Sequence, residues 1–201
     1  TTGNESIVAH IYDFHPYFYV KVPSDWDETK CFKFLTKSVL HNSNKKYYFM
    51  VNRKLSTLVK STDFYGFHYD TINKYITEFN YYKIVFHSFR HMKNCSEAIQ
   101  YYYHTQQDNE LYSDWFSQDK ISNNNSYMYE SDIHPVLRFI HETNIKPAGW
   151  VSCCEINQKN HRDCFSCHEI VTSVKHIEPI QNESTSAYVV ASFDIECDSS
   201  H

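Results

Sequence analysis

Two acidic residues near the C-terminal end of the sequence have the type and spacing for metal chemistry. Asp194 and Glu196 follow residues 187–193, whose apolar and β-branched content predicts a buried strand. On a strand, residues i and i+2 point to the same face, about 6.5–7 Å apart. Two carboxylates at a strand end can hold a pair of divalent ions and assist phosphodiester hydrolysis. Taken alone, Asp-x-Glu is a common tripeptide whose ordinary place is a solvated strand end.

A second set of potential ligands lies between positions 153 and 168. It consists of Cys153, Cys154, His161, Cys164, Cys167 and His168. The Cys-x-x-Cys-His pattern at its end matches covalent haem attachment, which we reject because the N-terminus has no export signal. A structural zinc site needs four N or S ligands. The segment has one Cys-x-x-Cys knuckle, and a strand would put Cys153 and Cys154 on opposite faces. We therefore expect reduced thiols here and not zinc.

Composition excludes some classes of protein. The 201 residues carry a net charge of −5. A module that binds nucleic acid by phosphate neutralisation alone is usually basic, so the charge argues against a dedicated non-specific DNA-binding protein. No apolar run approaches the roughly 18 residues that span a membrane. The 7 cysteines have no regular spacing, and the sequence shows no secretory signal. Both observations predict reduced thiols in an intracellular compartment.

The elements of the first half alternate between strands and helices. We expect residues 6–12 and 17–22 to form an antiparallel hairpin, whose aromatic side chains are either core or a base-stacking platform. A helix capped by Ser24 follows. Strands at 46–52 and 81–87 and a helix at 95–104 complete the pattern. It predicts an α+β fold, in which helices cover one face of an antiparallel sheet.

The second half begins with a polar segment, 106–127, that we interpret as a long loop. A helix then starts at Ser131 or Asp132, with Pro135 in its first turn. Its apolar stripe is formed by Val136, Leu137 and Ile140, and Arg138 points away from the stripe, towards an ion pair, solvent or a phosphate. Extended segments are expected at 150–156, 165–174 and 175–180.

Several blocks of sequence resemble family B DNA polymerases, most closely the delta-type enzymes and their large-DNA-virus relatives. The blocks are Phe193-Asp194-Ile195-Glu196-Cys197, similar to the first exonuclease motif; Phe14-His15-Pro16-Tyr17-Phe18-Tyr19; Tyr65-Gly66-Phe67; and Tyr129-Glu130-Ser131-Asp132-Ile133 with Leu137-Arg138-Phe139-Ile140, Ile145 and Trp150. They occur in the order of the family and span residues 14–197. The family usually has Gly where Pro147 stands, so the local turn differs.

The resemblance implies a domain organisation. Residues 1–180 would be the N-terminal domain of such a polymerase, 181–186 a linker, and 187–201 the truncated start of a ribonuclease H-like 3′–5′ exonuclease domain. Asp194 and Glu196 would be catalytic ligands of two Mg²⁺ ions that further acids complete in a longer chain. By itself the fragment would be a structural or template-contacting part, without nuclease or polymerase activity.

The resemblance also implies partners and a location. The complete enzyme would act in DNA replication on primer-template DNA and dNTPs, with a sliding clamp and accessory subunits, in the nucleus or at a viral replication site and not at a membrane. A translesion relative without proofreading is disfavoured, because both acids are present. The alternative from a different class is a stand-alone nucleic-acid or protein binding module, stabilised by zinc, in which Asp194 and Glu196 are incidental.

Overall fold

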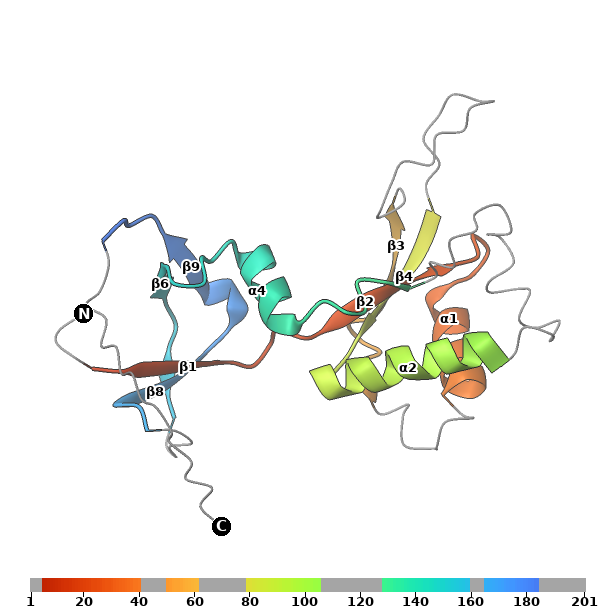
Figure 1. The fold of residues 1–201 in the computed structure, drawn as a ribbon, viewed down its shortest axis with the longest axis horizontal. Coiled ribbons are helices and arrows are strands. Elements are labelled where there is room, and N and C mark those ends of the chain that lie inside the picture. The colour runs from red at the N-terminus through yellow and green to blue at the C-terminus, as the bar shows by residue number, and fades with distance from the viewer. Residues whose placement is uncertain (1–4, 41–49, 62–78, 106–127, 160–164, 185–201) are drawn as a thin grey trace, which may run out of the picture.

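The computed structural model describes residues 5–40, 50–61, 79–105, 128–159 and 165–184, and these ranges form two lobes joined near helix α4 (Figure 1). The architecture is mixed α+β, with mostly antiparallel strands and few helices, as the sequence predicts. No helix among these residues is long and apolar enough to cross a membrane.

The larger lobe is a four-stranded antiparallel sheet of order β3-β4-β2-β5. Its strands are β2 (Tyr17–Val22), β3 (Thr57–Ser61), β4 (Phe79–Val85) and β5 (Met128–Tyr129). Helix α1 (Glu28–Phe34) continues into a π-helical turn, η1 (Leu35–Val39), and α2 (Phe89–Thr105) lies beside them (Figure 1). Because strand residues alternate between faces, one face of β2 packs against these helices and the other faces away.

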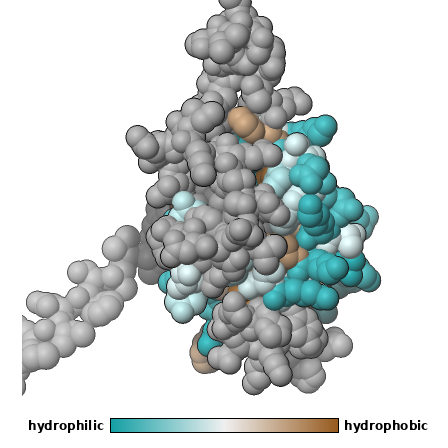
Figure 2. Space-filling model, turned by 90° about the vertical axis from the view of Figure 1, so that its right-hand side faces the viewer, coloured by the Kyte–Doolittle hydropathy of each residue, from teal (hydrophilic) through white to brown (hydrophobic). Residues whose placement is uncertain are grey.

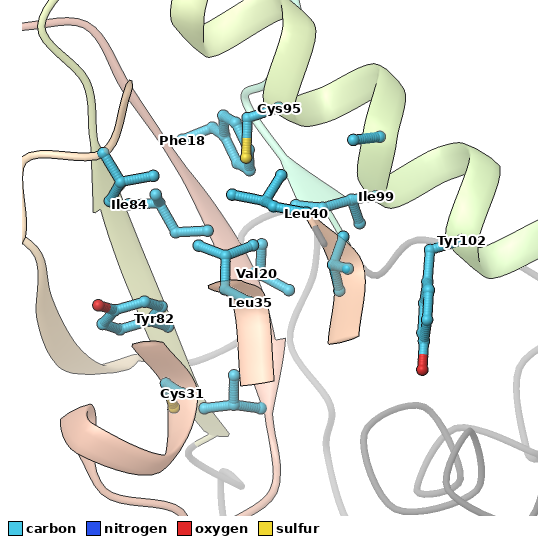
Figure 3. Close-up of a cluster of buried hydrophobic side chains, with 14 of the residues drawn as sticks. Phe18, Val20, Cys31, Leu35, Leu40, Tyr82, Ile84, Cys95, Ile99 and Tyr102 are labelled. Atoms are coloured by element: carbon cyan, nitrogen blue, oxygen red, sulfur yellow. The ribbon is translucent and has the colours of Figure 1, made fainter. Parts of the chain in front are cut away.

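The core of the molecule lies between this sheet and its helices (Figure 3). Phe18 and Val20 of β2, Ile84 of β4 and Leu35 of η1 are fully buried, and Ile99 of α2 is 1% exposed. The outer face that Figure 2 shows is mostly hydrophilic over the described residues, with small apolar areas. Apolar burial therefore supplies the main stabilisation of this lobe.

The smaller lobe is built from short strands. A three-stranded sheet of order β1-β8-β7 contains β1 (Ile7–Ile11), β7 (Asn157–Gln158) and β8 (His168–Thr172). A two-stranded antiparallel sheet pairs β6 (Trp150–Cys153) with β9 (Ile177–Ile180), after a short 3₁₀ turn, η5 (Val174–His176). Helix α4 (Pro135–Thr143) lies between this lobe and β2 (Figure 1).

The predicted N-terminal hairpin is wrong. β1 pairs in parallel with β8, Ile7 opposite His168, whereas β2 pairs with β4 and β5 in the other lobe. The turn at 13–16 is therefore a crossing between lobes. Strand propensity correctly located both strands, but their partners lie 58 or more residues away in the sequence, where local pattern carries no information.

Several boundaries also differ from the prediction. The first helix is capped by Asp27, whose carboxylate accepts from the Lys30 amide at 2.6 Å, and not by Ser24. Strand β3 lies between the strands expected at 46–52 and 81–87 and was not itself predicted. Helix α2 begins six residues before the predicted position 95, and α4 is capped by His134 instead of Ser131 or Asp132. The extended segments in the second half are confirmed in shorter form.

Other predictions lie outside the described residues. They include most of the strand at 46–52, the sequence block Tyr65-Gly66-Phe67, the loop at 106–127 and the strand at 187–193. Within the first of these, Val51 forms an isolated antiparallel bridge with Phe86. The division of the chain at 180 and 186 stays a prediction.

Candidate functional site

The two acids with the clearest chemical signal, Asp194 and Glu196, lie outside the described residues. Their convergence on one metal pair therefore stays a prediction. Within the described part of the chain, no three His, Cys, Asp or Glu side chains gather into a group that could hold a metal ion.

The cysteine and histidine cluster is only partly described, since His161 and Cys164 lie outside it. Cys154 is exposed, with its sulfur 3.6 Å from the His176 carbonyl oxygen, and Cys167 is exposed beside Ser6. Cys153 is half-buried, and burial raises its pKa. A thiol with a raised pKa is a weaker metal ligand and nucleophile at neutral pH.

A polar junction does form where β2 meets α4, and it unites residues from two of the sequence blocks. Arg138 of α4 is only 6% exposed. Its Nη1 donates to Oε2 of Glu130 at 2.6 Å, and its Nη2 donates to the Glu130 carbonyl oxygen at 3.2 Å. Its guanidinium carbon lies 3.9 Å from the centre of the Tyr17 ring. The side chains of Tyr17, Glu130 and Arg138 therefore form one contact set across more than 110 residues of sequence.

Tyr17 carries further contacts. Its hydroxyl donates a short hydrogen bond to Glu142 of α4, and the Lys83 ammonium lies 3.7 Å from its ring centre. With two cations on its ring and an acid on its hydroxyl, Tyr17 is committed to contacts within the protein. This favours the structural interpretation of the β2 aromatics over a base-stacking platform, which needs open ring faces.

The electrostatics of the junction are balanced. Burial works against the charge of Arg138, but the contacts with Glu130 and Tyr17 together outweigh it and raise the pKa of the guanidinium, so Arg138 stays charged. Burial, together with the hydrogen bond to Glu142, raises the pKa of Tyr17 and keeps the phenol protonated. Burial lowers the pKa of Lys83. Lys83 and Arg138 face Glu130 and Glu142, which leaves no surplus positive charge for a phosphate.

Local backbone conformation before and after α4 orients this helix towards the junction. Glu130 has a φ of 64°, in the left-handed region, and it turns the chain directly after β5. Pro135 occupies the first turn of α4, and Asn144, at φ 55°, ends the helix in the left-handed conformation. Phe14 packs edge-on against Phe139 at 5.2 Å between ring centres, next to the junction.

The structure places some site residues that the sequence did not single out. Arg138 was singled out with an ion pair, solvent or a phosphate as its possible partners, and the structure shows the ion pair with Glu130. Tyr17, Lys83 and Glu142 were not recognised as its neighbours. Two features of the sequence could have indicated this site: a lone arginine, Arg138, beside the apolar stripe of a helix, and a strand, Tyr17–Val22, that alternates Tyr with apolar residues. They indicate a buried cation but do not identify the partners.

Comparison with known proteins gives the junction a family context. The family model for the exonuclease domain of family B DNA polymerases matches residues 126–201. The match includes Glu130, Arg138 and Glu142 of the junction as well as Asp194 and Glu196.

Similarity to individual proteins extends over the whole chain. The DNA polymerase of Phaeocystis pouchetii virus is 28% identical over all of this chain, which corresponds to 18% of that polymerase. The DNA polymerase of Pyramimonas orientalis virus is 27% identical, also over all of the chain and 15% of the relative. The DNA polymerase delta catalytic subunit of Plasmodium falciparum is 25% identical over 96% of the chain and 17% of the relative.

The chain spans less than a fifth of the length of these relatives. The sequence blocks, the exonuclease-domain match and the relatives agree with one another along the chain. Residues 126–201 therefore resemble the exonuclease domain of family B DNA polymerases, and the chain as a whole is similar to viral DNA polymerases and to a DNA polymerase delta catalytic subunit.

Proposed function

We propose that this chain is part of a replicative DNA-directed DNA polymerase with a 3′–5′ proofreading exonuclease. One observation carries the proposal: the chain is similar along its whole length to DNA polymerases, and the part that matches the exonuclease domain contains Asp194 and Glu196. In this proposal residues 187–201 begin an exonuclease domain of ribonuclease H-like fold.

Asp194 and Glu196 fit the metal that the family implies. Mg²⁺ prefers hard oxygen ligands, and two carboxylates one residue apart on a strand supply them from one face. When bound, Mg²⁺ supplies Lewis-acid assistance to the attack of water on the terminal phosphodiester. The protein contributes the position of the two carboxylates, and further acids of the longer chain complete the ligand set.

The described lobes would serve as a scaffold beside that site. The polar junction fixes α4 against β2, so the segment that leads towards residues 187–201 starts from a defined position. In the complete enzyme this scaffold would flank the template strand. Primer-template DNA, dNTPs, a sliding clamp and accessory subunits are partners of that longer enzyme, in the nucleus or at a viral replication site.

The experiment that tests this proposal replaces both acids in the complete polymerase. Asp194→Ala with Glu196→Ala should abolish excision of a mismatched 3′ end while primer extension continues at its normal rate. Glu178→Ala with Glu183→Ala, which removes two exposed acids just upstream, is the matched control and should leave excision unchanged. Survival of excision in the first variant would show that these carboxylates are not the metal ligands.

A second measurement concerns residues 1–201 alone. With two acids of the presumed ligand set, this piece should neither degrade single-stranded DNA nor extend a primer in the presence of Mg²⁺. Robust Mg²⁺-dependent degradation would contradict the proposal that further acids of a longer chain are needed for nuclease activity. Stoichiometric zinc in the purified chain would instead support the binding-module alternative.

A further inference from the structure

Positive charge is concentrated in the larger lobe. Its described residues carry ten Lys and Arg side chains against four Asp and Glu side chains, over residues 17–40, 50–61, 79–105 and 128–129. The rest of the described chain carries four against nine. Salt screens exposed charges beyond about 8–10 Å, so a partner responds to the charge of the surface that it meets. The net charge of −5 for the whole chain therefore does not describe this lobe.

Three of the four acids in the larger lobe have partners near the start of α1. Asp27 caps the helix, and Asp25 lies 3.3 Å from the Lys30 ammonium. The Glu28 carboxylate accepts a hydrogen bond from the Thr57 hydroxyl at 2.6 Å. Most of the negative charge of the lobe is therefore held at the N-terminal end of α1.

Four exposed cations gather at the other end of this helix. The guanidinium carbon of Arg53 lies 4.9 Å from the centre of the Phe32 ring. Glu28, one helical turn before Phe32, contacts Thr57, so the chain from 57 back to 53 runs alongside α1. The turn at 53–54 therefore lies beside the C-terminal end of the helix. The exposed cations of these two segments form what we call the basic patch: Lys33, Lys37, Arg53 and Lys54.

The helix dipole does not account for the basic patch. Lysines near the end of a helix balance a dipole that corresponds to about half an elementary charge. The basic patch carries four positive charges, two of them from a separate segment. Among the residues that the structure describes, none of the four forms an ion pair with an acid. Most of this positive charge is therefore open to solvent, in contrast to the balanced charge of the polar junction.

We propose that the basic patch binds the phosphate backbone of a nucleic-acid strand. Lysine binds a phosphate as a point charge, and an arginine guanidinium can donate two parallel hydrogen bonds to its oxygens. Because Arg53 already lies against the Phe32 ring, the patch reads the backbone and not the bases, and binding is independent of sequence. The inference rests on the proposed function and deepens it, since it assigns the template contact to one surface.

Oligonucleotide binding by the 201-residue chain tests the proposal. Fluorescence anisotropy with a labelled oligothymidylate of about 20 nucleotides should show binding that weakens as salt rises. Lys33→Gln with Lys37→Gln should weaken binding by about tenfold or more at about 50 mM salt. The slope of log affinity against log salt should become shallower by about 1.4, because two phosphate contacts are lost.

A matched pair of cations lies elsewhere in the same lobe. Arg90 and Lys93 are exposed in the first turns of α2, whereas α2 meets α1 at Tyr102, whose ring centre lies 5.8 Å from that of Phe34. Twelve residues of helix, about 18 Å, separate Arg90 from Tyr102, which exceeds the screening length. Arg90→Gln with Lys93→Gln removes the same charge and should leave affinity and slope unchanged. Circular dichroism verifies that both variants keep their fold.

The second segment of the patch gives an independent variant. Arg53→Gln with Lys54→Gln should weaken binding as much as the change in α1, because the four cations contact one strand. Equal affinity of this variant and the unaltered chain would overturn the proposal. So would an equal loss in the variant at Arg90 and Lys93, or an unaltered chain that does not bind at about 50 mM salt.

Further probes identify the ligand. A duplex of the same length distinguishes a double-stranded from a single-stranded source of the phosphates, and binding of either through the patch supports the proposal. A glutamate homopolymer of equal charge should compete poorly. Competition as strong as that of the oligonucleotide would instead indicate an acidic protein and overturn it. If excision depends on Asp194 and Glu196 but the chain does not bind these probes, the patch proposal fails and the proposed function stands.

Discussion

Each of the two lobes of this molecule is stabilised by a different kind of interaction. In the larger lobe a closed apolar core fills the space between sheet and helices, and its central side chains are 0–1% exposed. In the smaller lobe and its junction, the buried apolar side chains among the described residues are Ile170 and Ile177. The buried polar ones there are Arg138, Ser166, Glu169, Thr172 and Ser173.

The polar contacts of the smaller lobe are paired across distant segments. The Glu169 side chain is 1% exposed and contacts His10 Nε2 at 2.9 Å and Lys159 Nζ at 3.9 Å. Asp13 accepts hydrogen bonds from the Ser173 hydroxyl and from the Val174 amide. Because buried polar groups stabilise only when their partners are in place, we expect this lobe to be more sensitive to charge and pH than the larger one.

The largest expected effect is in the apolar core. Ile84→Ala, at a fully buried position of β4, should destabilise the larger lobe by about 3–4 kcal/mol through lost burial and a cavity. The same change at Ile177 in β9 should cost about 2 kcal/mol or less, because fewer apolar neighbours surround it. Chemical denaturation followed by hydrogen exchange in each lobe measures both. Equal losses would mean that the smaller lobe has an apolar core of its own.

The junction provides the next largest effect. Arg138→Met keeps much of the side-chain volume but leaves Glu130 without its cation, and should cost about 2–3 kcal/mol, since Glu130 retains some solvent. The matched change is Arg53→Met, which removes an exposed arginine 4.9 Å from the Phe32 ring and should cost under about 1 kcal/mol. Thermal unfolding of the two variants compares them. If Arg138→Met lowered the free energy of unfolding no more than Arg53→Met, the junction would contribute no more to stability than an exposed surface contact.

Acid should distinguish the lobes. Partial burial raises the pKa of Asp13, but hydrogen bonds from Ser173 and Val174 outweigh it and hold the pKa below the ordinary 3.8. A carboxyl whose folded pKa is lowered contributes stability above its unfolded pKa, and that stability is lost as pH falls through the folded value. Between about pH 5 and pH 3, exchange at residues 168–176 should therefore rise earlier than at 79–86. Asp13→Asn should remove this difference at a cost of about 1 kcal/mol at neutral pH.

The smallest effect is expected at an exposed ion pair of the larger lobe. The Lys30 ammonium lies 3.3 Å from Asp25, whose side chain is 71% exposed. Asp25→Asn should change the free energy of unfolding by less than about 0.5 kcal/mol, because solvent screens the pair. Urea denaturation at low and high salt measures this. A loss of more than about 1 kcal/mol would show that surface charge matters in both lobes.

Alternation and apolar spacing in the sequence were sufficient to locate most elements. β2, β4, α2, α4 and the strands β6, β8 and β9 were predicted because the periods of two and 3.6 residues are local properties. The ordered motif blocks indicated a resemblance to family B DNA polymerases, in agreement with the family model that matches residues 126–201. The Asp-x-Glu pair remains the clearest chemical signal in the chain, and it still rests on the sequence.

Tertiary structure decided which surfaces meet. The apolar stripe of α4 was correctly identified from Val136, Leu137 and Ile140, but its direction was not, because the stripe faces outward and Arg138 faces inward. Here Glu130 and Tyr17 give Arg138 a buried site in which the guanidinium has its partners, and this offsets the cost of burying its charge. The parallel pairing of β1 with β8 has the same origin. Partners more than 100 residues apart are selected by contacts that no local pattern contains.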